Sequence, residues 1–263
     1  MESNKEIEII EEKYLSKYFH FLKSIEDEIL EGYYSKETIR NDWGHVQLVG
    51  HSDSDVGLER IVYFHFSGRF FGKPNSNPIG SDLLFETDDA FIHIDVKTVK
   101  ASLTGKTNIS DYNTDIFVGN NQTNYNGKID VGGVEKEYKN AKLPTYYTIN
   151  NNKKICLTYF LTFLYNEDNS RLLSISLINM PNGELVNIYK KLPLKAGKRQ
   201  DGLTKEERKK YSETIRFNWS KTIEYKLLNN KKRVKIVYFD KNMDNQFKNK
   251  LKLIEKIYDN QDS

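Results

Sequence analysis

The 263-residue sequence contains a single cysteine, Cys156. One thiol excludes an internal disulfide and any zinc site built from several cysteines. Because Cys156 lies in the apolar run ICLTYF, we expect a small buried side chain and not a reactive thiol. No segment reaches the roughly 20 apolar residues that a membrane helix needs. The N-terminus, MESNKEIEIIEEK, lacks a hydrophobic signal region, so we expect a cytoplasmic protein of bacterial type that binds no membrane.

What the chain does contain is enough apolar material for a core. Hydrophobic residues make up 38% and aromatic residues 13% of the sequence, which is too much for a disordered protein. A chain of this length is compatible with one domain, and no internal repeat or boundary divides it. We therefore predict a single domain over residues 1–263, with insertions around 104–152.

The net charge of +3 conceals an uneven distribution. Residues 1–38 carry ten acidic and five basic side chains, a net charge of −5, whereas residues 190–235 carry sixteen basic and five acidic side chains, a net charge of +11. We expect this basic C-terminal part to face phosphates. Lysines that only solvate an exposed surface would produce the same pattern.

Apolar periodicity predicts an α/β (α+β) fold with a central mixed β-sheet flanked by helices. Gly32 is expected to end the first helix, and the segments 67–80 and 104–152 are expected to be mostly loop. Helices are predicted at 5–31, 55–64, 205–221 and 242–258, and strands at 81–87, 90–99, 114–118, 155–165, 171–178 and 233–240, with possible short strands at 43–50 and 185–189.

Polar and charged residues alternate with apolar ones on the predicted strand 90–99. Asp95 and Lys97 are two positions apart on one strand, so their side chains emerge on the same face. Asp82 opens the strand before it, and the carbonyl of Val96 offers another oxygen. Hard Mg²⁺ prefers oxygen ligands, and a lysine beside an attacking water favours its deprotonation. The pattern therefore indicates phosphodiester hydrolysis.

The same residues carry a resemblance to a known family. The segment PIGSD ends at Asp82, and after twelve intervening residues DVK runs from Asp95 to Lys97. This arrangement resembles the PD-(D/E)xK motif of type II restriction endonucleases. The resemblance implies that Asp82 and Asp95 bind Mg²⁺, that Lys97 is the catalytic lysine, and that the fold is restriction-endonuclease-like. Ser81 departs from the proline of that motif.

The resemblance also implies a further metal ligand. The helix before the motif often contributes an acidic group in this family, and Glu59 in GLERIVYF matches that position. A solvated helix carboxylate is the alternative interpretation. The acidic-x-lysine pattern alone is weak, since it also begins at Glu11, Glu137, Glu207 and Glu224. An ordinary surface hairpin would explain the motif without chemistry.

We expect the partner to be double-stranded DNA, bound by a homodimer because a palindromic site matches a twofold protein. The insertions around 104–152 are expected to read DNA. The asparagine and glutamine side chains between Gly119 and Gly127 could form paired hydrogen bonds with adenine edges, although such amides are also common in polar turns. The candidate DNA contacts are Arg69, Lys73, Lys100, Lys106, Asn120, Asn121, Gln122, Asn124, Lys198 and Arg199. The predicted function is site-specific cleavage by a type II restriction enzyme. A repair or junction-resolving nuclease and a non-catalytic DNA-binding protein are the alternatives.

Overall fold

The computed structural model describes residues 4–42, 61–66, 72–74, 82–103, 115–131, 133–166, 168–197, 204, 206, 215–221 and 232–261. Most of the expected loop at 67–80 and the possible strand at 43–50 lie outside these residues, as does 55–60 of the second predicted helix. Residues 61–66 are helical, as predicted for the end of that helix. None of the described helices is long and apolar enough to cross a membrane.

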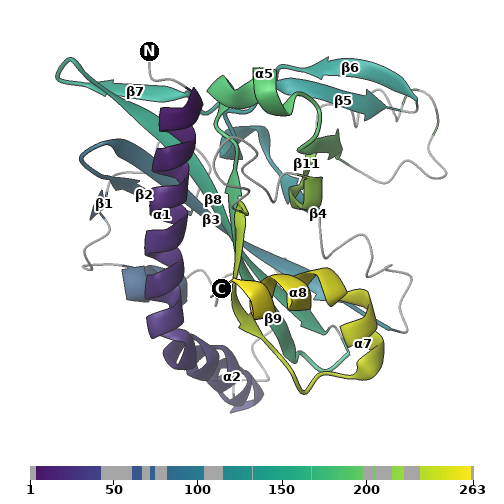
Figure 1. Cartoon of the computed structure of the whole chain (residues 1–263). Helices are drawn as coiled ribbons and strands as arrows, with labels where there is room; N and C mark the ends of the chain where they lie inside the picture. Colours follow the sequence, from purple (N-terminus) through teal and green to yellow (C-terminus); the bar gives the residue numbers. More distant parts are fainter. Residues whose placement is uncertain are drawn as a thin grey trace.

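Among the described elements, α1 and α2 come first, most strands follow in the middle of the chain, and α7 and α8 come last (Figure 1). The helices are α1 (Asn4–Ser24), α2 (Glu26–Asp42), α5 (Val186–Tyr189), α7 (Asn245–Lys250) and α8 (Lys252–Asn260), with 3-10 turns η1 (Asn120–Gln122), η2 (Gly183–Leu185) and η3 (Trp219–Lys221). The strands are β1 (Lys73–Pro74), β2 (Leu83–Glu86), β3 (Ala90–Ala101), β4 (Asp115–Val118), β5 (Gly127–Val131), β6 (Val134–Tyr138), β7 (Tyr146–Ile149), β8 (Asn152–Asn166), β9 (Leu172–Met180), β10 (Leu194–Ala196), β11 (Ile215–Asn218) and β12 (Val234–Phe239).

A seven-stranded mixed sheet forms the centre, in the order β1-β2-β3-β8-β9-β12, with β7 also paired to β8. The neighbours β3 and β8 run parallel, and the other pairs are antiparallel. Strand β8 is buried along its length from Ile155 because it lies inside the sheet and both faces are covered. The central mixed sheet with flanking helices confirms the predicted fold class.

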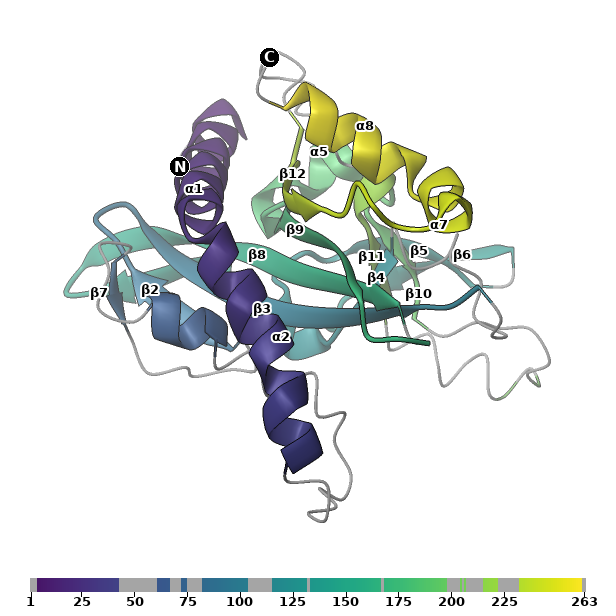
Figure 2. The same ribbon diagram turned by 90° about the horizontal axis from the view of Figure 1, so that it is seen from below.

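Different layers cover the two faces of the main sheet. Tyr159 of β8 packs against Tyr18 of α1, with ring centroids 5.8 Å apart, and α1 also packs against β9 and β12. The C-terminal helix α8 lies beside β12 (Figure 2). Phe160, the sequence neighbour of Tyr159, points to the other face and packs against Phe217 of β11, at 6.0 Å. Strand β11 belongs to a second, three-stranded sheet, β10-β11-β4. Asp95 of β3 stands beside Phe160 in the parallel pairing of β3 with β8, so both side chains lie on the same face. The second sheet therefore covers the face of β3 that carries Asp95.

Gly32 does not end the N-terminal helix, contrary to the sequence-based expectation. The chain instead breaks at Ile25 between α1 and α2, and α2 continues through Gly32 to Asp42. A Cβ added at Gly32 would lie 3.2 Å from the Cδ1 atom of Ile61. Glycine therefore suits this position, because a larger residue would require the Ile61 side chain to shift by a few tenths of an ångström.

Two further predictions differ from the structure, and some of its strands were not predicted. Residues 185–189 form the end of η2 and α5 instead of a strand, because the side chain of Asn182 accepts a hydrogen bond from the backbone of Glu184 and caps the turn. Residues 215–221 form β11 and η3 instead of the end of a helix, since alternating Ile215 and Phe217 pack inward. The hairpin β5–β6 was not predicted, although the GG pair at 132–133 is a turn signal.

A buried charged cluster joins the N-terminal helix to the C-terminal strands. Glu8, Glu11 and Arg233 have fully buried side chains, and Arg233 lies 3.1 Å from Glu8 and 2.7 Å from Glu11. Arg233 also donates to Asn179, and Tyr189 donates to Glu8 at 2.6 Å. Burial raises the pKa of Glu11 to about 7, although Arg233 lowers it. One guanidinium thus serves two carboxyl groups.

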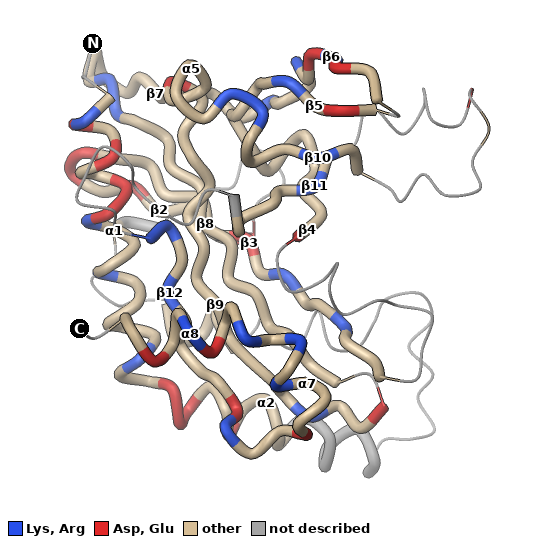
Figure 3. The backbone as a smooth tube through the Cα atoms, turned by 45° about the vertical axis from the view of Figure 1, so that its right-hand side comes forward, with Lys and Arg blue, Asp and Glu red and all other residues tan. Residues whose placement is uncertain are grey.

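The charge asymmetry of the sequence is partly visible in space. Acidic positions gather on the first half of α1, whereas basic positions occur on β10 and β11 (Figure 3). Within the second sheet, Lys195 and Arg216 flank the buried carboxylate of Asp115, at 3.1 Å and 3.5 Å. Part of the positive charge of the C-terminal region is therefore already paired inside the protein.

Candidate active site

The antiparallel pairing of β2 with β3 brings the first two motif residues together. Leu83 pairs with Ile94, so Asp82 and Asp95 stand at the next position of the same register. Asp82 is exposed, and its Oδ2 atom accepts a hydrogen bond of 2.6 Å from the backbone N–H of Val96. Its carboxylate thus lies against the peptide group that joins Asp95 to Val96.

Asp95 is a buried carboxylate whose nearest cation is Lys97. Its side chain is 1% exposed, and the Nζ atom of Lys97 lies 2.5 Å from its Oδ1 atom. Lys97 itself is 22% exposed and reaches the surface. A charge so deeply buried requires a partner. The prediction that Asp95 and Lys97 share one face of the strand agrees with this contact, and the surface hairpin considered from the sequence does not fit the burial of Asp95.

Gln122, at the end of η1, completes this cluster. Its Nε2 atom donates to Asp95 Oδ2 at 2.5 Å, and its Oε1 atom accepts from Lys97 Nζ at 3.1 Å. The same Oε1 atom accepts from the backbone N–H of Gly119 at 2.8 Å. Sequence reasoning had assigned Gln122 to base reading, and no local pattern indicated that its amide would contact two residues of β3.

Another copy of the acidic-x-lysine pattern shows how much the environment matters. Glu137 and Lys139 on and after β6 also form an ion pair of 2.5 Å, but their side chains are 59% and 74% exposed. The same spacing therefore produces a solvated surface pair at β6 and a buried pair at β3. Strand context, and not the pattern itself, distinguishes Asp95 and Lys97.

Burial shifts the pKa values of Asp82 and His93, which lie near Asp95. Desolvation raises the pKa of Asp82, while the Val96 N–H and the Lys97 ammonium act in the opposite direction. His93 is fully buried and stacked on Tyr147, and desolvation lowers its pKa to about 4. It is therefore neutral at physiological pH and too deeply buried to touch a phosphate, so it is a structural histidine.

The donor set fits a hard cation. Asp82 and Asp95 bring two carboxylates against one lysine, and oxygen is the ligand that Mg²⁺ prefers. The carbonyl of Val96 lies between the two motif positions on β3. Within the described part of the chain, no cluster of three or more His, Cys, Asp or Glu side chains is suited to a metal. Glu59, expected as a further ligand, lies outside the described residues.

The amide loop between Gly119 and Gly127 requires a correction. Asn124 is 4% exposed, donates to the carbonyls of Pro144 and Cys156 at 3.1 Å and 3.0 Å, and accepts from the N–H of Gly183 at 3.0 Å. A Cβ added at Gly183 would lie 2.3 Å from the carbonyl oxygen of Asn124, so the two segments touch. Asn124 is therefore a structural amide and not a base reader.

Of the other expected DNA contacts, some are at least partly exposed and some lie outside the described residues. Asn121 is exposed in η1 and Asn120 is partly exposed, so these two amides still face outward from the loop. Lys100 is exposed near the end of β3. Only the backbone of Lys73 is described, in β1. The remaining positions, which lie outside the described residues, are Arg69, Lys106, Lys198 and Arg199.

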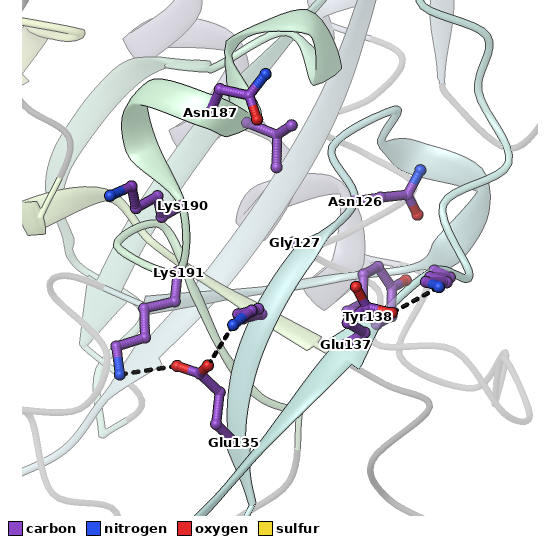
Figure 4. A pocket seen from close by; sticks show the side chains of 11 residues that line it. Asn126, Gly127, Glu135, Glu137, Tyr138, Asn187, Lys190 and Lys191 are labelled. Atoms are coloured by element: carbon purple, nitrogen blue, oxygen red, sulfur yellow. Dashed lines mark hydrogen bonds and ion pairs between the residues drawn. The ribbon is translucent and has the colours of Figure 1, made fainter.

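A pocket of about 590 Å³ lies elsewhere, between the β5–β6 hairpin and α5 (Figure 4). Glu135 lies there between Lys128 and Lys191, at 2.7 Å and 3.1 Å, and Glu137 pairs with Lys139. Both glutamates that line the pocket are thus already paired with lysines. The pocket lining holds four lysines and two glutamates, whereas at β3 the two carboxylates of Asp82 and Asp95 face the single lysine Lys97.

Two family models match the chain. Residues 3–169 match the N-terminal domain of the type II restriction enzyme MwoI, and residues 172–239 match its central domain. No curated protein matches. The boundary between the two matches falls in the turn between β8 and β9, so both contribute to the same sheet.

Solved structures resemble the chain in fold. The restriction endonuclease BglI bound to its DNA recognition sequence has a TM-score of 0.62 and 16% identity, with 89% of this chain and 91% of that chain covered. The tetrameric restriction endonuclease SfiI bound to cognate DNA has a TM-score of 0.57 and 16% identity, with 92% and 87% covered. With the family match over more than half of its length, this chain belongs to the MwoI family of type II restriction enzymes, site-specific DNA endonucleases of the PD-(D/E)xK class.

Proposed function

We propose that this enzyme cuts double-stranded DNA with Mg²⁺ at a site formed by Asp82, Asp95 and Lys97. The observation that supports it is the cluster on β3, where Lys97 lies 2.5 Å from the buried Asp95 while Asp82 binds the intervening peptide. Buried charge of this kind lowers stability unless it is compensated, so it is more typical of a functional site than of a surface hairpin.

Each residue has a distinct task in this proposal. Asp82, Asp95 and the carbonyl of Val96 would hold Mg²⁺, with Glu59 as a further ligand. Bound there, Mg²⁺ would activate water and offset negative charge on the phosphate. The ammonium of Lys97 has three N–H donors, and Asp95 and Gln122 accept two of them in the described structure. The third donor would orient water or stabilise a phosphate oxygen.

Contacts to the rest of the duplex would come from basic and amide side chains. We propose that Lys100, together with Arg69, Lys73, Lys106, Lys198 and Arg199, binds phosphates, which supplies affinity without sequence information. Asn120 and Asn121 are the proposed base-reading amides that remain exposed. A twofold recognition site would be matched by a homodimer. Because its substrate is DNA, we place the enzyme in the cytoplasm of a bacterial cell.

The decisive experiment is cleavage of plasmid DNA. The purified protein should produce discrete fragments with Mg²⁺ and none with EDTA, and Asp95→Ala should bind the duplex but not cut it. Random degradation would favour a repair nuclease, and binding without any cleavage would favour a non-catalytic protein. Wild-type cleavage by Asp95→Ala would show that the site has been placed wrongly.

A further inference from the structure

We infer that Gln122 is a positioning residue that holds Asp95 and Lys97 in the orientation required for DNA cleavage. This inference rests on the proposed function of the Asp95 cluster. Gln122 lies in the turn η1, which follows β4 of the second sheet, 25 residues beyond Lys97 in the chain. It nevertheless forms hydrogen bonds to both residues, and no other residue reaches both in the contacts described above.

The polarity of a carboxamide matches the two charges it meets. The donor end, Nε2, faces the Asp95 carboxylate at 2.5 Å, and the acceptor end, Oε1, faces the Lys97 ammonium at 3.1 Å. The opposite amide orientation would place oxygen against carboxylate and NH₂ against ammonium. The neighbouring charges therefore allow only one orientation of the side chain, and the N–H of Gly119 stabilises it by donating to Oε1 at 2.8 Å.

The turn that carries Gln122 is itself anchored on both sides. The backbone N–H of Gln122 donates to Gly119 at 3.0 Å, the N–H of Lys142 donates to the carbonyl of Asn120 at 2.8 Å, and that of Leu143 donates to Thr123 at 3.1 Å. This turn follows β4 directly, and β4 pairs with β11 of the second sheet. Gln122 thus connects the second sheet to the catalytic strand through a fixed turn.

The Asp95 carboxylate has two partners, Lys97 and Gln122, which together fix its orientation better than either partner would alone. Lys97 binds Oδ1 and Gln122 binds Oδ2, so rotation of the carboxylate about its last bond would break both contacts. Lys97 has a flexible four-carbon stem and would constrain the carboxylate poorly by itself. Loss of such a supporting contact around a metal ligand typically lowers activity by about 10- to 100-fold. We expect an effect of that size.

Two substitutions of Gln122 test whether it orients Asp95 and Lys97 or only stabilises the turn η1. Gln122→Glu has nearly the same shape and keeps an oxygen towards Lys97 and Gly119, but it replaces the donor that faces Asp95 with a second oxygen. Gln122→Ala removes both contacts without adding charge. Gln246→Glu makes the same chemical change at an exposed position in α7 and serves as the matched control.

The assay compares three quantities for each variant: the single-turnover cleavage rate on the duplex identified by fragment mapping, the dissociation constant of that duplex without Mg²⁺, and the unfolding temperature. Both Gln122 variants should cut about 10- to 100-fold more slowly while the dissociation constant stays within about threefold. The Gln246→Glu variant should match the wild type. If Gln122→Glu does not fold, the same criteria apply to Gln122→Ala.

A folded Gln122 variant that cuts within about threefold of the wild-type rate would overturn the inference. So would a loss of DNA affinity as large as the loss of rate, because the residue would then contribute to binding instead of positioning. Asp95→Ala is measured in parallel. If Asp95→Ala is inactive while the Gln122 variants are normal, only this inference fails; if Asp95→Ala cuts normally, the proposed function fails.

Discussion

The contrast between Lys97 and Lys139 yields a direct test of the site. Each lysine follows an acidic residue by two positions and forms an ion pair of 2.5 Å, but the acid is 1% exposed beside Lys97 and 59% exposed beside Lys139. We therefore compare Lys97→Met with Lys139→Met. Methionine keeps much of the length and apolar stem of lysine and removes the charge.

The burial of Asp95 sets the size of the expected effect. Without Lys97, the carboxylate retains the Gln122 amide but loses its nearest cation. Removing one partner of a buried charged pair costs up to about 3 to 5 kcal/mol, and the partial exposure of Lys97 lowers this to about 2 to 4 kcal/mol. At about 3 °C for each kcal/mol in a chain of this size, the unfolding temperature should fall by roughly 6 to 12 °C.

Activity should respond more strongly than stability. Loss of a cation that stabilises the transition state lowers the rate by about 100- to 1,000-fold. At a temperature where the variant is folded, Lys97→Met should therefore cut plasmid DNA at least about 100-fold more slowly than the wild type. Lys139→Met should show no change in either quantity. Equal unfolding temperatures and equal cleavage rates for the two variants would refute the role assigned to Lys97.

Three further predictions concern other parts of the molecule. Burial raises the pKa of Glu11 to about 7 although Arg233 lowers it, so the stability that its protonation contributes is complete below about pH 4.5 and is lost as the pH rises through about 7. Glu11→Gln should flatten the fall of the unfolding free energy between about pH 5 and pH 8 in urea titrations, and an unchanged slope would contradict this account. Asn124→Ala should lose about 2 to 4 kcal/mol of stability, with unchanged sequence preference, because the Pro144 carbonyl and the Gly183 N–H lose their partner while the Cys156 carbonyl keeps only Asn182. Relaxed preference without destabilisation would restore the base-reading interpretation. Asn121→Ala should cost about 1 to 3 kcal/mol at one A·T pair only, whereas Lys100→Ala should weaken cognate and random DNA alike and reduce the salt slope by about 1. Binding isotherms on single-base variants at several salt concentrations decide this last point.

Local periodicity explains why the β2–β3 hairpin, which carries the proposed site, was predictable. Alternation with period two fixes which side chains share a face, so the pairing of Asp95 with Lys97 follows from one strand and its neighbour. The position of Asp82 needs only a short antiparallel connection. All three residues thus lie within a stretch of sequence whose structure is decided mostly by its own pattern.

Contacts between distant segments could not be predicted in the same way. Gln122 and Asn124 occupy one polar turn, yet one contacts the active-site strand and the other binds the interior near Gly183. Nothing in the loop sequence distinguishes these outcomes, because both depend on which segment packs above the turn. Gly32 is similar: its role is set by Ile61, which lies 29 positions away, and not by local helix termination.

The two family segments depend on each other for the same reason. The first, residues 3–169, contains β3, which carries the proposed site, and its parallel neighbour β8, but β8 pairs along its other edge with β9 of the second segment. The second segment also supplies Arg233, which compensates the buried Glu8 and Glu11 of α1. An isolated first segment would expose an edge of β8 and leave two buried carboxylates without their guanidinium, both of which are strongly unfavourable. The geometry of the Asp95 site is therefore a property of the combined sheet, even though every residue proposed to act chemically lies in the first segment.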